Sequence, residues 1–171
     1  IKAYKDIKKD MWGKTYQEAI TTGIYLAHIL AGTDLFKDHC VSLVGFSLGT
    51  IVVMHCVWEL QRMNRSDIIY DCLLMGGVLN VQDFNKETLD VLTNRLINVH
   101  SRDDFILKFL LPVVDWDTEP NGIFPIPSLD HKVQNLDVTN EIGGHLKYKE
   151  NVNKILSRTD FNEDILDKVN D

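Results

Sequence analysis

The sequence predicts an α/β protein with a mostly parallel sheet and helices on both faces, and three observations support this. Short apolar segments rich in Val, Ile and Leu alternate with longer segments in which apolar residues recur every three or four positions, which is typical of such sheets. Residues 45–49 form a Gly-x-Ser-x-Gly motif between an apolar strand and an apolar helix. Ser47, Asp104 and His145 each follow a predicted strand, and the carboxyl ends of parallel strands meet at one edge, where ligands bind.

The composition is that of a soluble globular domain. The 171 residues are 44% hydrophobic and 25% charged, enough for one core. The net charge of −7 and the lack of a basic stripe exclude nucleic acid as a partner. The longest apolar cluster, residues 105–114, is shorter than the ~18 residues of a membrane span. Because the first residue is Ile1 and not Met, we expect a piece of a longer protein, with any membrane contact made through a region outside this chain.

The three cysteines do not suggest a disulfide or a metal site. Cys40, Cys56 and Cys72 are odd in number and lack a Cys-x-x-Cys spacing, so we interpret them as reduced core residues of an intracellular protein. The sequence also lacks a His-Glu-x-x-His motif. We therefore expect neither a metal nor a cofactor.

The first half of the chain divides into clear segments. Residues 1–13 alternate Lys and Asp with a few apolar residues and predict a linker or a solvated helix, and residues 14–157 predict the folded domain. Apolar positions from Lys14 onward predict an amphipathic helix that Gly32 ends. After it we expect a strand from residue 41 up to the Gly-x-Ser-x-Gly motif, then a buried helix over 50–60 with an exposed end over 59–65. A strand over 68–75, a short helix within 83–94 and a strand over 95–100 are expected to follow.

The second half is less regular. A helix is expected over residues 105–114, followed by a loop over 115–129 that holds three of the four prolines. A fourth strand over 133–138, a turn over 143–145 and a closing helix over 146–156 complete the domain. Residues 158–171 predict a polar tail.

The motif at residues 45–49 predicts a nucleophile elbow. Its serine, Ser47, sits on a strained turn, and Gly45 and Gly49 flank it because a Cβ at either position is expected to collide with the neighbouring strand or helix. The backbone N–H of Leu48 lies at the positive end of the next helix, where it can hold an oxyanion.

A serine hydroxyl needs a base, and the base needs an orienting carboxylate. Ser47, Asp104 and His145 occur in the chain order serine, acid, histidine that α/β-hydrolases use. Asp103 competes with Asp104. One of the two is expected to point to the histidine and the other to cap the helix at residue 105, and the alternative is that both are caps. Asp104 is favoured.

His145 is the favoured base because two glycines precede it and leave room for its loop to approach the elbow. His131 is the rival, beside Asp130, but it precedes its strand and is expected at the opposite edge. His55 is interpreted as a core histidine on the buried helix. The others are assigned to a strand or to the surface: His100, His28 and His39.

These residues predict a serine hydrolase that cleaves an ester through an acyl-enzyme. A thioesterase or acyltransferase would use the same parts. The helix over 105–114 and the proline-containing loop are either an apolar wall for an acyl chain or ordinary core. A different class of function is a non-catalytic, hydrolase-shaped module that binds a membrane partner.

Several segments taken together resemble one known family. They are residues 41–49 with the buried helix after them, 71–77, 95–107, 135–138 and 144–148, and they resemble the transmembrane and coiled-coil domain-containing protein 4 family of α/β-hydrolases. The resemblance implies an α/β-hydrolase fold over about residues 15–157. It places the family's nucleophile on Ser47, its acid on Asp104, and its histidine on His145.

The resemblance has further implications. Family members carry apolar, membrane-embedded segments upstream, and a fungal relative is lipase-like, which implies a lipid-like ester substrate and an endomembrane location. The strands that precede the elbow in this fold, with the loop that gives the second oxyanion donor, have no counterpart in the chain. We therefore expect the carboxyl-terminal part of a hydrolase domain, with one sheet edge exposed and weak activity unless the missing part is supplied.

Overall fold

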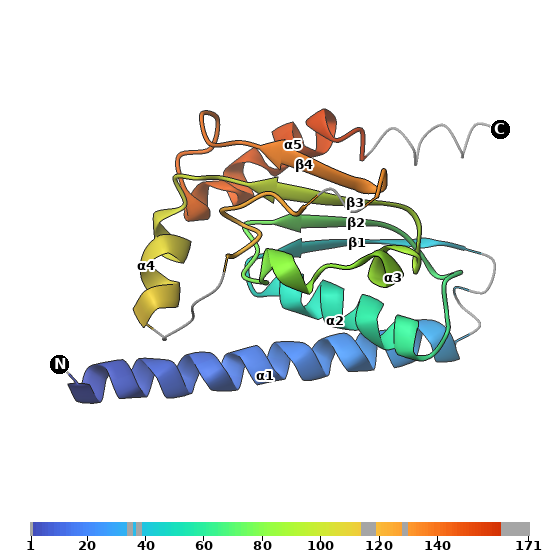
Figure 1. Cartoon of the computed structure of the whole chain (residues 1–171), viewed down its shortest axis with the longest axis horizontal. Helices are drawn as coiled ribbons and strands as arrows, with labels where there is room; N and C mark the ends of the chain where they lie inside the picture. Colours follow the sequence, from blue (N-terminus) through green and yellow to red (C-terminus); the bar gives the residue numbers. More distant parts are fainter. Residues whose placement is uncertain (1, 34–35, 37–38, 114–118, 128–129, 162–171) are drawn as a thin grey trace.

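A four-stranded parallel sheet forms the centre of the molecule (Figure 1). The computed structural model describes residues 2–33, 36, 39–113, 119–127 and 130–161. The strands are β1 (Val41–Phe46), β2 (Ile69–Met75), β3 (Leu92–His100) and β4 (Val133–Asp137), and they pair in the order β1-β2-β3-β4. Their carboxyl ends point toward one edge of the sheet. The predicted α/β class with a parallel sheet is confirmed.

Helices connect the strands. The α-helices are α1 (Lys2–Gly32), α2 (Gly49–Arg62), α3 (Lys86–Leu89), α4 (Phe105–Val113) and α5 (Val152–Arg158). The described residues also include the short 3₁₀ turns η2 (Val81–Asp83), η3 (His145–Lys147) and η4 (Lys149–Asn151). In Figure 1, α4 lies just beyond the carboxyl ends of the strands, and α1 runs along α2.

Alternate side chains of β2 enter two separate cores, as the period of two in a strand requires. Cys72 and Leu74 pack in the core that contains α1 and α2. Leu73 and Met75 pack in a second core on the other face, with residues of η3 to α5 such as Tyr148 and Ile155. The centre of the sheet is therefore covered on both faces, with Leu48 packed against the first core and Phe46 of β1 against the second.

The first helix is longer than the sequence suggests. It begins at Lys2 and runs without a break through residue 13, so the expected division between residues 13 and 14 does not coincide with a change of backbone structure. Gly23 lets α1 approach α2 closely, because a Cβ there would lie 2.5 Å from the carbonyl oxygen of Val52. The expected polar tail lies mostly outside the described residues.

Three sequence expectations are wrong in detail. The segment 59–65 is not an exposed end throughout, because Glu59 and Leu60 are buried. The closing helix over 146–156 is divided into η3, η4 and α5, so its helical period covers only its last part. Cys40 is exposed and lies before β1, whereas Cys56 and Cys72 are buried core residues as expected.

One edge of the sheet is open among the described strands. There β1 pairs with β2 alone, and Val44 of β1 is 48% exposed. Across the described residues, every helix is too short or too polar to cross a lipid bilayer.

Candidate active site

Ser47 occupies a tight turn between β1 and α2. Its φ is +53°, a left-handed conformation that is strained for a residue with a side chain. The backbone N–H of Ser47 donates to the carbonyl oxygen of Met75 at 2.9 Å, and this hydrogen bond holds the turn in place. A Cβ on Gly45 would lie 2.8 Å from the carbonyl oxygen of Gly49, so a glycine is required at residue 45. The same expectation for Gly49 is wrong, because a Cβ there meets nothing within 4 Å.

The structure brings the three predicted side chains together in one hydrogen-bonded chain. Nε2 of His145 lies 2.9 Å from Oγ of Ser47, and its Nδ1 lies 2.7 Å from Oδ2 of Asp104. Asp104 is fully buried and His145 is 7% exposed. The three residues come from the ends of β1 and β3 and from the turn after β4, so the parallel topology alone explains why distant segments meet here.

Asp104 combines the two roles that we expected Asp103 and Asp104 to share. Its Oδ2 contacts His145, while its Oδ1 accepts the backbone N–H of Leu107 at 3.1 Å and so caps α4. Asp103 is exposed, and its backbone N–H donates to Oγ of Ser101. The expected division of work between the two carboxylates is therefore wrong, and Asp104 alone reaches the histidine.

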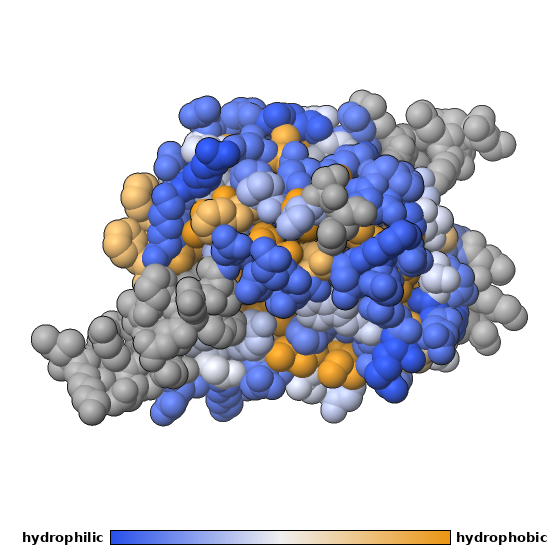
Figure 2. Space-filling view, in the orientation of Figure 1, coloured by the Kyte–Doolittle hydropathy of each residue, from blue (hydrophilic) through white to orange (hydrophobic). Residues whose placement is uncertain are grey.

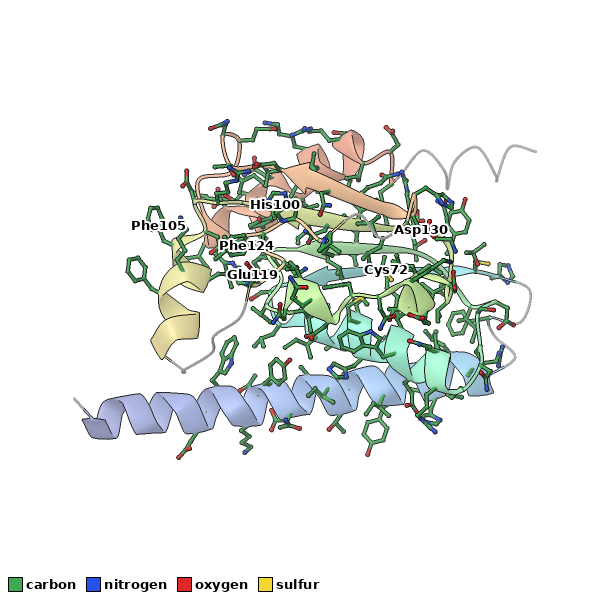
Figure 3. The ribbon with its side chains drawn as sticks, viewed as in Figure 1. Cys72, His100, Phe105, Glu119, Phe124 and Asp130 are labelled. Carbon is green, nitrogen blue, oxygen red and sulfur yellow. The ribbon has the colours of Figure 1, made fainter. Side chains whose placement is uncertain are left out.

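His131 lies just before β4, at the amino ends of the strands and opposite the elbow, as expected. It pairs with Asp130 and is exposed, and Figure 3 shows Asp130 far from Phe105, which follows Asp104 directly. Of the remaining histidines, His55 contacts Trp58 edge-on at 4.7 Å and is only half-buried, and burial lowers its pKa. His28 is bound to Glu59, and His100 is buried in β3, where burial lowers its pKa.

Aromatic rings and a glycine position the imidazole of His145. The ring of Phe46 is 4.9 Å away, and Tyr148 approaches edge-on at 6.2 Å. Gly76, with φ +53°, leaves room for the imidazole, since a Cβ there would lie 3.3 Å from two of its ring atoms. Burial, with the nearby Asp104 carboxylate, raises the pKa of Tyr148 and keeps it neutral. Sequence reasoning missed these supports, although Gly76-Gly77 at a strand end was a visible signal.

Leu48 follows Ser47 and is the N-cap residue of α2, with φ −58° and ψ −24°. Its N–H is therefore at the positive end of a 14-residue helix, next to the serine hydroxyl. The position suits a donor to an oxyanion formed at Ser47.

Exposed apolar side chains flank the site. Phe105 and Phe109 of α4 are 60% and 69% exposed and stack with ring centres 6.3 Å apart. Leu146, which follows His145, is 73% exposed. Figure 2 shows hydrophobic side chains at the surface where α4 lies, and Figure 3 shows Phe105 pointing away from the body of the molecule. The part of the chain that the structure describes has no group of three His, Cys, Asp or Glu side chains placed to hold a metal ion.

The chain is thus an α/β protein with a hydrogen-bonded serine, histidine and aspartate at the carboxyl edge of a parallel sheet. The chain belongs to the family described as "Protein of unknown function (DUF726)", whose pattern matches residues 2–162. An uncharacterized membrane protein of Schizosaccharomyces pombe is 30% identical over 92% of the chain and 20% of its own length.

Two further relatives have more informative names. The rice transmembrane and coiled-coil domain-containing protein STS1 is 28% identical over 94% of the chain and 24% of its own length. The Saccharomyces cerevisiae protein named probable lipase MIL1 is 28% identical over 86% of the chain and 14% of its own length. The family resemblance predicted from the motifs is confirmed, and the chain spans a quarter or less of each of these relatives. No solved structure matches the chain.

Proposed function

We propose that this chain carries the catalytic site of a serine hydrolase that cleaves an ester. The observation that carries the proposal is the continuous path from Ser47 through His145 to the buried Asp104, with both links at hydrogen-bond distance. We further propose that residues 14–157 are the carboxyl-terminal part of an α/β-hydrolase domain. In the α/β-hydrolase fold, further strands pair with the outer side of the strand that precedes the nucleophile. The open edge of β1, which precedes Ser47, supports the assignment because such strands could pair there.

The first half of the reaction forms an acyl-enzyme. Oγ of Ser47 attacks the ester carbonyl carbon while Nε2 of His145 accepts the hydroxyl proton. Asp104 holds Nδ1–H and stabilises the imidazolium, and the N–H of Leu48 donates to the oxyanion. When the carbon–oxygen bond to the alcohol breaks, His145 returns the proton to the leaving oxygen, and the acyl group remains on Ser47.

The second half restores the enzyme. A water molecule attacks the acyl carbon as His145 accepts one of its protons. The bond to Oγ of Ser47 then breaks, and the proton passes from His145 to the serine. The products are a carboxylic acid and an alcohol, and no cofactor takes part in this sequence.

The substrate that we propose is a lipid-like ester. Phe105 directly follows Asp104 in the sequence, and its exposed ring stacks with that of Phe109. We propose that an acyl chain bound at Ser47 extends over these two rings. A relative named as a probable lipase and others named as membrane proteins support this choice. An intracellular, endomembrane location is part of the same proposal, with membrane contact through a region outside this chain.

An active-site probe tests the proposal. The full-length protein is treated with a fluorescent fluorophosphonate, which reacts with activated serines, and the labelled peptide is identified by mass spectrometry. We expect labelling at Ser47, none in Ser47→Ala, and none in wild type denatured beforehand. A folded wild-type protein that remains unlabelled would contradict the proposal and favour the non-catalytic binding module.

A second assay separates the related activities. Fluorophosphonates also label serine thioesterases and acyltransferases, because those enzymes form an acyl-enzyme on their serine too. Turnover of matched oxygen esters and thioesters, with and without an added acceptor alcohol, distinguishes them. We expect the oxygen ester to be hydrolysed and water to be the preferred acceptor.

A further inference from the structure

The loop over residues 119–127 is bound into the active-site edge by buried asparagines, and the reaction described above does not use it. Asn98 in β3 and Asn121 in the loop have no exposed surface. The amide nitrogen of Asn121 donates to Oδ1 of Asn98 at 3.0 Å, and Oδ1 of Asn121 accepts the N–H of Leu79 at 3.0 Å. The backbone N–H of Asn121 donates to the carbonyl oxygen of Leu79 at 2.8 Å.

Asn98 continues the network outward. Its amide nitrogen donates to the carbonyl oxygen of Phe124 and to Oδ1 of Asn135, at 3.2 and 3.1 Å. Asn135 in turn exchanges two hydrogen bonds with the backbone of Ile126. Figure 3 shows Glu119 and Phe124 of this loop near one another over the sheet. Each buried amide has partners at both its oxygen and its nitrogen, so the network is rigid and specific in geometry.

Gly122, the residue after Asn121, joins the two turns that support the site. Its N–H donates to the carbonyl oxygen of Gly77 at 2.8 Å, and its carbonyl oxygen accepts the N–H of Ser101 at 2.9 Å. Gly76-Gly77 is the turn behind the imidazole of His145. Ser101 accepts the N–H of Asp104 at its own carbonyl oxygen, at 3.2 Å.

The fit at this junction is tight. A Cβ on Gly122 would lie 2.5 Å from the carbonyl carbon of Gly76 and 2.5 Å from a methyl carbon of Leu107, whose N–H binds Asp104. A Cβ on Gly77 would collide with the amide of Asn121. Any shift of Asn121 therefore moves the turn behind His145 and the turn before Asp104 relative to one another.

We propose that Asn121 is a positioning residue of the active site: by fixing Gly122 it sets the distance between Asp104 and the imidazole of His145. The inference rests on the proposed serine-hydrolase function for its effect on rate. Its structural consequence, the geometry of the His145–Asp104 hydrogen bond, can be measured without turnover.

The test compares Asn121→Ala with Asn85→Ala in the full-length protein. Asn85 caps α3 by accepting the N–H and hydroxyl of Thr88, each at 2.8 Å, and it is exposed. Loss of this cap lowers stability without touching either turn. Turnover of a soluble short-chain ester is measured per active site, with sites counted by fluorophosphonate labelling. We expect Asn121→Ala to lower kcat by roughly 10- to 100-fold with KM within about twofold, and Asn85→Ala to leave both unchanged.

A spectroscopic readout separates this inference from the proposed function. The proton between Nδ1 of His145 and Asp104 gives a far-downfield proton NMR signal, recorded in a Ser47→Ala background. We expect Asn121→Ala to shift or abolish it and Asn85→Ala to leave it in place. If wild type shows no turnover, the proposed function fails, but the signal still tests the positioning.

Two further variants keep the test possible if Asn121→Ala does not fold. Asn121→Ser keeps a small polar side chain, and Gly122→Ala pushes the two turns apart while every asparagine remains. We expect both to move the same signal. Folded Asn121 variants that keep the wild-type kcat and an unmoved signal would overturn the inference.

Discussion

Asp104 and its neighbour Asp103 lie in opposite environments. Its carboxylate is fully buried and joins the histidine to the first turn of α4, whereas Asp103 is exposed. A carboxylate in this position holds the imidazole in the tautomer that accepts the serine proton. An exposed carboxylate one residue away has no such contact.

The two aspartates therefore give a matched pair of variants. We expect Asp104→Asn to lower kcat by about 10³- to 10⁴-fold, because an amide cannot hold the imidazole in the working tautomer. We expect Asp103→Asn to change it less than about threefold. Initial rates on a soluble ester, normalised to folded protein, measure both effects. Equal losses in the two variants would mean that the acid has been assigned to the wrong residue.

The sequence predicted that Ser47 and His145 would meet, because each stands in a glycine motif at a strand end, and the structure places them within hydrogen-bond distance. It favoured Asp104 over Asp103 as the acid but left both possible. Both follow β3, and the choice depends on the turn at Ser101, whose carbonyl oxygen accepts the N–H of Asp104. The roles of Phe46 and Tyr148 were also hidden, because they depend on ring packing across the two faces of the site.

At the scale of elements, the packing of α1 on α2 depends on a close approach at Gly23. A Cβ there would lie 2.5 Å from the carbonyl oxygen of Val52 and 2.8 Å from Cβ of His55. Gly13 lies on the same helix, and a Cβ there meets nothing within 4 Å. The two glycines differ only in what they face.

We expect Gly23→Ala to reduce the free energy of unfolding by about 1–3 kcal/mol through overpacking. We expect Gly13→Ala to increase it by about 0.5–1 kcal/mol, because alanine favours the helix. Denaturant titration followed by circular dichroism measures both. A stabilised Gly23→Ala protein would show that α1 does not pack on α2 at this point.

The same helix pair contains a pH-sensitive contact. Glu59 on α2 accepts hydrogen bonds from Arg62 at 2.7 and 2.8 Å and contacts Nε2 of His28 on α1 at 2.8 Å. The Arg62 hydrogen bond is the main cause that lowers the pKa of Glu59 from 4.5 to about 2, and His28 adds to it, while desolvation opposes the shift. A lowered folded-state pKa means that the contact stabilises the fold fully above about pH 4.5 and loses this effect as the pH falls toward 2.

We therefore expect the thermal unfolding temperature of wild type to fall more steeply between pH 5 and pH 3 than that of Glu59→Gln, which cannot ionise at this position. Circular dichroism melts across this range make the comparison. Curves that fall in parallel would indicate that the ionisation of Glu59 does not contribute to stability.

Element boundaries were harder to predict than element types. The alternating charges of residues 1–13 conceal a helix because this part lacks an obvious apolar stripe, and yet α1 begins at Lys2. The closing segment reads as one helix by its apolar period, but it begins with two 3₁₀ turns after Gly144, whose φ is +112°. The role of the loop over 119–127 was not visible in the sequence, because Asn121 binds Asn98 of β3 and the backbone of Ile126 binds Asn135 of β4.

At the scale of the whole molecule, the parallel order of the strands explains why residues nearly a hundred positions apart meet. The four strands place the elbow, the acid turn and the histidine turn at one edge, and helices cover both faces. This arrangement followed from the alternation of strand and helix in the sequence. Among the described strands β1 has an open edge, and the chain spans a quarter or less of each of these relatives.

If Ser47 is the nucleophile, it becomes acylated during turnover, and mass spectrometry of the digested protein detects the acyl group. The full-length protein is mixed with an activated ester, quenched in acid within the first turnovers, and digested to locate any added mass. We predict one acyl group on the peptide that contains Ser47, absent from Ser47→Ala. Ester turnover by a folded protein without acylation of Ser47, or with the acyl group on another residue, would contradict the account.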